Sequence, residues 1–72
     1  MSEKDIRALL EYETNRGKIR QLSEKEIKEF HKKFNETLEN SDYYYSLDSE
    51  SDAAYSYRDD VFDEMIASYK VA

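Results

Sequence analysis

One helix start, near the end of the first third of the chain, constrains the fold more than any other feature. Ser23 and Glu26 form the S-x-x-E pattern of a capping box, in which each side chain binds the backbone N–H of the other residue. Leu22 before the cap and Ile27 after it have the spacing of a hydrophobic staple, so two independent signals indicate one start. Apolar side chains then recur at helical spacing: Ile27, Phe30, Phe34 and Leu38. We therefore predict a helix over residues 23–39.

A first helix is predicted over residues 3–15. Ser2 is a natural N-cap, and Asp5 three positions later completes a capping-box pattern. The apolar residues at the spacing of one buried face are Ile6, Leu9 and Leu10. Gly17, the only glycine, follows where a left-handed C-terminal cap is least costly. The apolar anchors of the link after it are Ile19 and Leu22.

A third helix is predicted over residues 50–69. It starts near Ser49 or Ser51, and Ser49 with Asp52 offers another capping-box pattern. Its predicted core face consists of Ala54, Val61, Phe62, Met65, Ile66 and Tyr69. Residues 40–48, by contrast, have no helical apolar period and are rich in Ser, Asp and Asn, which predicts a loop or one short irregular turn.

These signals predict the fold class. The chain has 72 residues, enough for one domain spanning residues 1–72, and it contains neither cysteine nor proline. No segment has a strand pattern. We predict an all-α, small three-helix bundle, with a possible short irregular fourth turn at the tyrosine-rich loop. Without disulfides or an evident metal or cofactor site, such a bundle depends on packing alone.

Charge divides the chain into two parts. Residues 16–35 carry seven Lys or Arg against three Glu, a local charge of +4, whereas residues 36–69 carry ten Asp or Glu against Arg58 alone, a local charge of −9. An acidic half repels phosphates, so it disfavours nucleic acid as the main ligand and favours a basic protein surface.

The basic stretch has an ordinary explanation. Its lysines alternate with glutamates, and two pairs stand four residues apart in the favourable order, Glu24 with Lys28 and Glu29 with Lys33. Such a pattern is typical of a solvated helical face with intrahelical ion pairs. Direct nucleic-acid binding through residues 16–33 is therefore the least favoured function.

The segment Ser41–Asp60 is the candidate binding surface, because it combines five tyrosines with six carboxylates. Tyrosine supplies wide, rigid contact area with one hydrogen-bonding tip, and carboxylates steer a partner of opposite charge. Three consecutive tyrosines cannot all share one side of a regular element, so at least one ring of Tyr43–Tyr45 is expected to be exposed. The ordinary-surface interpretation stays open. The predicted partner-binding residues are Asp42, Tyr43, Tyr44, Tyr45, Asp48, Glu50, Asp52, Tyr55, Tyr57, Asp59 and Asp60.

Two patterns that suggest chemistry have simpler interpretations. His31, the only histidine, has no cysteine or ordered Ser/His/Asp set beside it in the sequence, so we predict no catalytic or metal role and no enzyme activity. Five residues match positions of a calcium-loop template: Asp48, Glu50, Asp52, Ser56 and Asp59. The template also needs a glycine where Ala53 stands and a glutamate where Asp59 stands. An acidic first helical turn explains the same residues.

The N-terminal segment carries charges where a signal peptide needs an apolar run, and no stretch approaches the ~20 apolar residues of a membrane span. We therefore expect a cytoplasmic protein without membrane contact.

Three motifs occur here in the order in which one known family shows them. Ser2–Ile6 is followed by Leu9, and Ser41-Asp42 precedes the tyrosines Tyr43–Tyr45. The motif between them comprises Ser23, Glu24, Glu26, Ile27, Phe30, Phe34, Glu36 and Glu39. Across residues 2–48 the chain thus resembles the immunity proteins of nuclease colicins and pyocins, small acidic helical proteins that bind the toxin's nuclease domain. The chain lacks the tryptophan and basic glycine-rich tail of that family's last helix.

The leading hypothesis is therefore a non-enzymatic, immunity-type inhibitor that blocks a basic surface of a protein partner. The resemblance implies a nuclease as that partner. Two alternatives stay open. One is a phage-type anti-host or anti-defence protein that acts as a DNA mimic, and the other is a structural subunit whose tyrosine face closes a homodimer.

Overall fold

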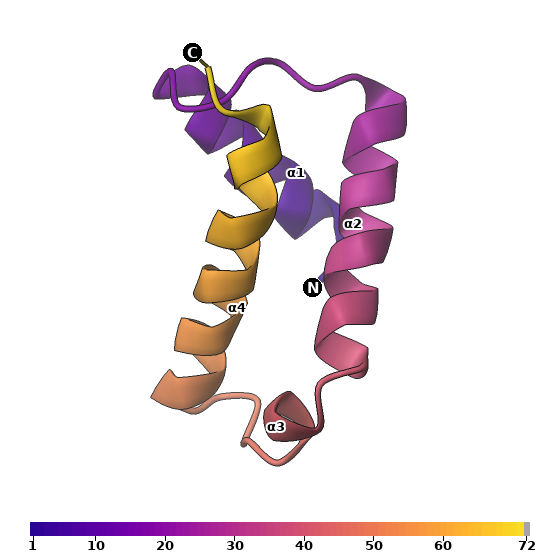
Figure 1. Cartoon of the computed structure of the whole chain (residues 1–72), viewed down its shortest axis with the longest axis vertical. Coiled ribbons are helices and arrows are strands. Elements are labelled where there is room, and N and C mark those ends of the chain that lie inside the picture. The colour runs from indigo at the N-terminus through magenta and orange to yellow at the C-terminus, as the bar shows by residue number, and fades with distance from the viewer. Residues whose placement is uncertain (72) are drawn as a thin grey trace.

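The computed structural model describes residues 1–71, and its regular elements in this range are all helical. They are α1 (Glu3–Asn15), α2 (Glu24–Glu39), α3 (Asp42–Tyr45), α4 (Asp52–Ile66) and the short 3₁₀ helix η1 (Ala67–Tyr69). Figure 1 shows α2 and α4 side by side in opposite directions, α3 closing one end between them, and α1 behind the pair. The predicted all-α bundle is confirmed, and the tyrosine-rich loop contains a regular helical turn instead of an irregular one.

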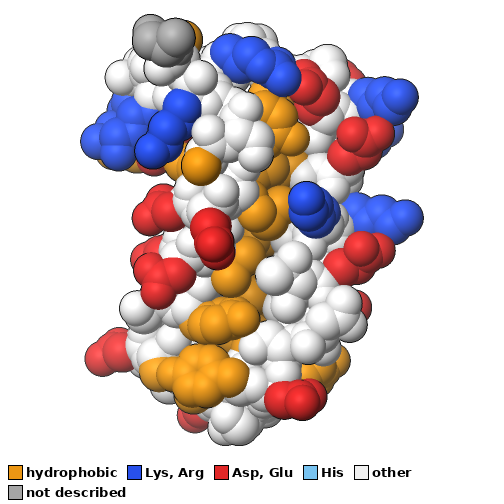
Figure 2. Space-filling view, viewed as in Figure 1, with side chains coloured by type: hydrophobic (Ala, Val, Ile, Leu, Met, Phe, Trp, Pro, Cys, Tyr) orange, Lys and Arg blue, Asp and Glu red, His pale blue; other side chains and the backbone are white. Residues whose placement is uncertain are grey.

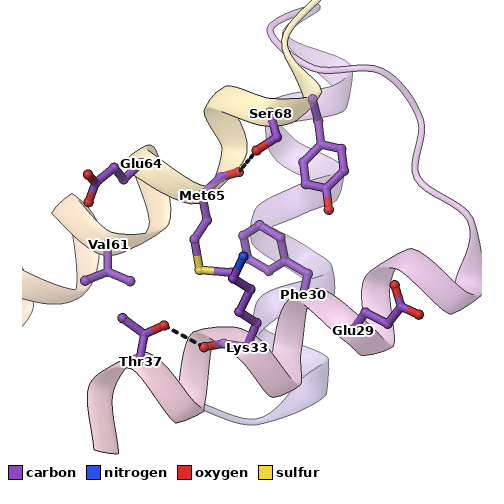
Figure 3. Close-up of a pocket in the computed structure, with 9 residues that line it drawn as sticks. Glu29, Phe30, Lys33, Thr37, Val61, Glu64, Met65 and Ser68 are labelled. Carbon is purple, nitrogen blue, oxygen red and sulfur yellow. Dashed lines mark hydrogen bonds between the residues drawn. The ribbon is translucent and has the colours of Figure 1, made fainter. Parts of the chain in front are cut away.

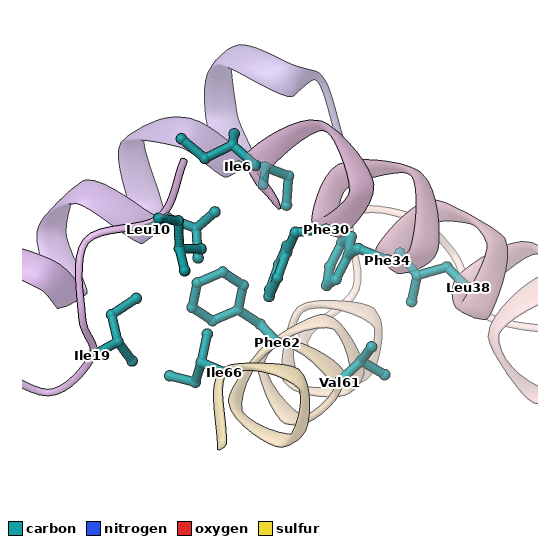
Figure 4. Packing of buried hydrophobic residues seen from close by; sticks show 11 residues of the cluster. Ile6, Leu10, Ile19, Phe30, Phe34, Leu38, Val61, Phe62 and Ile66 are labelled. Carbon is teal, nitrogen blue, oxygen red and sulfur yellow. The ribbon is translucent and has the colours of Figure 1, made fainter. Parts of the chain in front are cut away.

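The helix α2 is the centre of the bundle, because it packs against α1, α3 and α4. Its two phenylalanines meet one from α4: the ring centroids of Phe30 and Phe62 lie 5.5 Å apart, and those of Phe34 and Phe62 6.4 Å apart, both edge to face. The other members of the core cluster surround these rings: Ile6, Leu10, Ile19, Leu22, Ile27, Leu38, Val61 and Ile66. Figure 4 shows how this cluster packs. The predicted apolar stripe of α2 is therefore the core.

The predicted caps at Ser2, Ser23 and Gly17 are confirmed. The capping box of Ser49 with Asp52 is not formed, because Ser51, the other predicted start, caps α4 by accepting the Ala54 N–H. At the start of α2, the Glu26 N–H donates to Ser23 Oγ (3.2 Å) and the Ser23 N–H donates to Glu26 Oε1 (2.9 Å). At the end of α1, Gly17 has φ +78°, and the Lys18 N–H donates to the Glu13 carbonyl (3.1 Å). This left-handed geometry is the one that glycine adopts without steric cost.

The link between α1 and α2 lies against the C-terminal segment. The Arg20 N–H donates to the Tyr69 carbonyl (3.0 Å), and the Val71 N–H donates to the Lys18 carbonyl (3.2 Å). This contact is an isolated antiparallel bridge between Ile19 and Lys70, not a strand, and Ile19 is buried as predicted.

Two local expectations are wrong. Leu9 was expected in the buried face of α1, but it is 39% exposed, because Ile6 and Leu10 are the residues of α1 that enter the core cluster in the described part of the chain. The ion pair of Glu24 is made with Arg7 of α1 (2.8 Å), not with Lys28 within α2. Among residues 1–71, no ion pair joins Glu29 to Lys33 either.

Candidate protein-binding surface

The helix α3 sets the directions of the three consecutive tyrosines. Ser41 caps it by accepting a hydrogen bond from the Tyr44 N–H (3.2 Å), which nucleates a single turn. Within that turn Tyr43 and Tyr45 point outward, with 58% and 68% of their surfaces exposed, while Tyr44 is half-buried against the core. The predicted exposure of at least one ring is confirmed.

Two of the five predicted anchor tyrosines have internal roles. The rings of Tyr44 and Tyr57 stack with centroids 5.6 Å apart, and both pack against the core. The Tyr57 hydroxyl donates to Ser41 Oγ (3.0 Å), the same oxygen that caps α3. These two tyrosines therefore attach α3 to α4, and Tyr43, Tyr45 and Tyr55 are the rings that remain for a partner.

Arg58 organises this end of the molecule. Its Nη1 donates to the Tyr44 hydroxyl (2.6 Å), and Nη1 and Nη2 both reach the Ser49 carbonyl (3.3 Å). Its guanidinium carbon also lies 4.4 Å from the Tyr55 ring centroid. Sequence reasoning did not include Arg58 in the site, although a single cation among ten carboxylates was a signal. Arg58 therefore makes structural contacts within the protein.

The six predicted carboxylates are all exposed, and they come from α3, from the turn before α4 and from α4 itself. Asp48 has a local role, since its Oδ1 accepts the Glu50 N–H (3.1 Å) in the turn before α4. Asp42 and Asp52 lie in the first turns of α3 and α4, where a negative charge complements the helix dipole. The other carboxylates of the set are Asp59 and Asp60 of α4.

Charge is segregated on the surface as well as along the chain. On the face drawn in Figure 2, Lys and Arg gather toward the end that carries the α1–α2 link, and the charged side chains at the α3 end are Asp or Glu. Several cations of the basic stretch are already paired: Arg20 with Glu26 in a two-point contact, and Arg16 with Glu13 at 3.5 Å. This pairing reduces the positive charge available to a nucleic acid.

Two grooves flank α4. The α1–α4 groove, with a volume of about 600 Å³, receives Tyr44, Tyr55 and Asp59 from the predicted site. It adds residues that sequence reasoning did not place there, among them Asp5, Leu9, Tyr12, Glu13 and Asp63. The helical spacing of Tyr55, Asp59 and Asp63 was the available signal, but only the packing of α1 shows what faces them.

The other groove, between α2 and α4, has a volume of about 460 Å³. Figure 3 shows Phe30, Val61 and Met65 lining it, with Lys33 reaching across it from α2. Glu29 and Glu64 also lie at its edge, so this groove carries charges of both signs and favours neither an acidic nor a basic partner.

The residues of the calcium-loop template do not form a loop over their full length. The helix α4 begins at Asp52, so residues 52–59 are helical. Within residues 1–71, no three His, Cys, Asp or Glu side chains are grouped in a way that could hold a metal ion. His31 lies beside Asn35, and its Nε2 is 3.0 Å from the Met1 carbonyl. It has no carboxylate or nucleophile among its hydrogen-bond partners in the described part of the chain.

None of the helices in residues 1–71 has the length and apolar character that crossing a membrane requires. A scan against protein-family models found no match, and neither the curated proteins nor the solved structures contain one. The case for a function therefore depends on the geometry and charge of this chain itself.

Proposed function

We propose that this protein is a non-enzymatic, acidic inhibitor that occupies a basic surface of a protein partner. A nuclease is the partner class that we favour, because enzymes that bind phosphate backbones present basic surfaces. The resemblance to nuclease immunity proteins motivates the same choice and remains a prediction. The contact residues in this proposal are the exposed members of the set in 41–60, above all Tyr43, Tyr45 and Tyr55.

One observation carries the proposal: the exposed tyrosines lie at an acidic end whose only cation is used internally. Arg58 is held by Tyr44 and the Ser49 carbonyl and is covered by Tyr55. These partners are neutral, so Arg58 keeps its charge and offsets one carboxylate, and the ten carboxylates of residues 36–69 still leave this part of the chain at −9. Exposed aromatic rings within such a field combine electrostatic steering with contact area, the two properties of a tight protein interface.

The proposal is tested by comparative affinity capture from the native host. The bait proteins are the wild type, the Tyr43→Ala/Tyr45→Ala variant and the control variant Lys28→Ala/Lys32→Ala, whose changes are exposed on α2. A partner that the wild type and the control retain, and the tyrosine variant loses, is then purified. We expect a basic protein whose nucleic-acid-processing activity this chain inhibits. Equal capture by all three baits would contradict the proposal.

A further inference from the structure

The α1–α4 groove is an open surface that no other element of residues 1–71 fills. Both helices pack on α2, and they leave between them an open channel whose floor is made by the buried rings of Phe34 and Phe62. The groove follows Asp5 to Tyr12 on one side and Tyr55 to Asp63 on the other, a length of about 10–12 Å at the rise of a helix. That length corresponds to two helical turns or three to four extended residues of an occupant.

The walls of this groove are apolar and exposed. Leu9 and Tyr12 from α1 face Tyr55 from α4, and these side chains are 39%, 58% and 56% exposed. Isolated exposed apolar side chains are ordinary, but a convergent set over an aromatic floor is typical of a binding groove. The groove therefore offers a place for at least one apolar side chain.

The rim of the groove is acidic on both sides. Asp5 and Glu13 stand on the α1 side, and Asp59 and Asp63 on the α4 side. Among residues 1–71, Asp5, Asp59 and Asp63 take part in no ion pair. The cations at the groove are held by other groups: Arg58 by Tyr44 and Ser49, the N-terminal ammonium of Met1 by Asn35, and Arg16 by Glu13 and the Tyr12 ring.

Glu13 adds an unsatisfied oxygen to this rim. Its Oε1 lies 3.5 Å from Arg16, a long contact, and its buried Oε2 has no hydrogen-bond donor in the described part of the chain. Because the contact with Arg16 is long, the negative charge of Glu13 is only partly offset within the chain.

From these observations we propose that the α1–α4 groove binds a short, basic, amphipathic segment of a protein partner. An apolar side chain of the segment packs between Tyr12 and Tyr55, and Lys or Arg side chains beside it pair with the carboxylates of both walls. This inference deepens the proposed function, on which it rests for the positive charge of the partner. It assigns part of the contact to α1, which lies outside the tyrosine-rich segment.

The test uses nuclear magnetic resonance titration of the ¹⁵N-labelled protein with two synthetic peptides. One alternates leucine with lysine, and the other has serine in place of each leucine and so carries the same charge. We expect the leucine peptide to shift the amide signals of α1 and α4 around Leu9, Tyr12, Tyr55 and Asp63, and to bind at least tenfold more tightly than the serine peptide. Equal affinity of the two peptides, or shifts centred on α3, would overturn the inference.

Matched charge variants separate a specific groove from a general acidic surface. Asp59→Asn/Asp63→Asn removes two rim charges, and Glu36→Gln/Glu39→Gln removes two exposed charges of α2 that do not line the groove. The rim variant is expected to weaken leucine-peptide binding about tenfold more than the α2 variant. Equal losses would show that only net charge matters and would refute the groove.

Two further results separate this inference from the proposed function and from self-association. The Tyr43→Ala/Tyr45→Ala variant should bind the leucine peptide like the wild type even though it loses the captured partner. If this variant still captures the partner, the result contradicts the role proposed for Tyr43 and Tyr45 and leaves the groove inference unchanged. Sedimentation should show a monomer, whereas a dimer dissociated by Tyr12→Ala would mean that a second copy occupies the groove and would overturn the inference.

Discussion

The guanidinium of Arg58 donates a 2.6 Å hydrogen bond to the hydroxyl of Tyr44, and this contact joins α4 to α3. It is the shortest of three bonds by which Arg58 holds the turn between the two helices, since Nη1 and Nη2 also reach the Ser49 carbonyl. Tyr55, whose ring lies over Arg58, and Tyr45, which follows Tyr44 in α3, are thereby presented on a fixed frame.

Arg58→Ala should therefore destabilise the protein and loosen α3. Hydrogen bonds to charged groups contribute about 1.5–3 kcal/mol each, and their loss here is expected to lower the unfolding free energy by roughly 1–3 kcal/mol. Urea denaturation measures the change, and hydrogen exchange of residues 43–46 should accelerate. Arg16→Ala, which removes only the 3.5 Å pair with Glu13 and a stack on Tyr12, is the control and should change little. Equal effects of the two substitutions would contradict the role assigned to Arg58.

Phe34→Ala should be among the most destabilising single changes. Phe34 is fully buried between Phe30 and Phe62, so its loss leaves a cavity and is expected to cost about 3–5 kcal/mol. Thermal unfolding followed by circular dichroism gives the comparison with Tyr45→Ala, a large exposed aromatic residue, which should cost less than about 0.5 kcal/mol. A wild-type melting temperature for Phe34→Ala would show that this stripe is not the core.

Gly17→Ala should destabilise the protein through the backbone alone. Gly17 has φ +78°, and an added Cβ would meet no atom within 4 Å, so the cost is the left-handed conformation itself, about 1 kcal/mol. Gly17→Asn should cost less, since asparagine tolerates this region better. Urea unfolding of both variants provides the test, and an alanine variant as stable as the wild type would mean that the turn relaxes.

Acid should destabilise the fold through Glu26. Hydrogen bonds from Arg20, and then from the Ser23 backbone, lower the pKa of Glu26 from its ordinary value of 4.5 to about 2. A lowered pKa means that the folded state binds this proton more weakly than the unfolded state does. The stabilisation is therefore present above pH 4.5 and is lost as the pH falls toward about 2.

Urea unfolding across this pH range tests the assignment to Glu26. Glu26→Gln should flatten the pH dependence while keeping an acceptor for the helix cap. Glu29→Gln, an exposed change on the same helix, should leave the wild-type slope intact. Identical slopes for Glu26→Gln and the wild type would contradict the prediction.

Partner binding should separate into effects on association and on dissociation. Asp59→Asn/Asp60→Asn removes exposed charges, so it should slow association and flatten its salt dependence with little change in dissociation. Tyr43→Ala/Tyr45→Ala should instead speed dissociation, with a loss of about 2 kcal/mol or more if one ring is a hot spot. Surface plasmon resonance against the captured partner, over a salt series, measures both rates. If both variants bind like the wild type, the contact surface lies elsewhere.

Much of the fold could be predicted from local sequence. The capping box at Ser23, the stripe that contains Phe34, and Gly17 after the first helix each encode a local geometry that needs no distant partner. The start of α4 was predictable within a few residues for the same reason, since Ser51 accepts the Ala54 N–H as an ordinary N-cap does. The caps act within four residues and the stripe lies within one helix, so the local sequence encodes both.

The candidate surface, in contrast, depends on contacts between residues far apart in the chain. The sequence by itself determined that the segment Ser41–Asp60 contains five tyrosines and one arginine, but Tyr44 and Tyr57 became internal and Tyr43 and Tyr45 external only through packing on α2 and Arg58. Leu9 shows the same dependence, since helical spacing placed it in a buried face that the bundle leaves open. Periodicity gives the direction of a side chain around its own helix. The tertiary structure decides which faces of that helix are buried, because a face is buried only when a second element packs against it at a defined distance and angle.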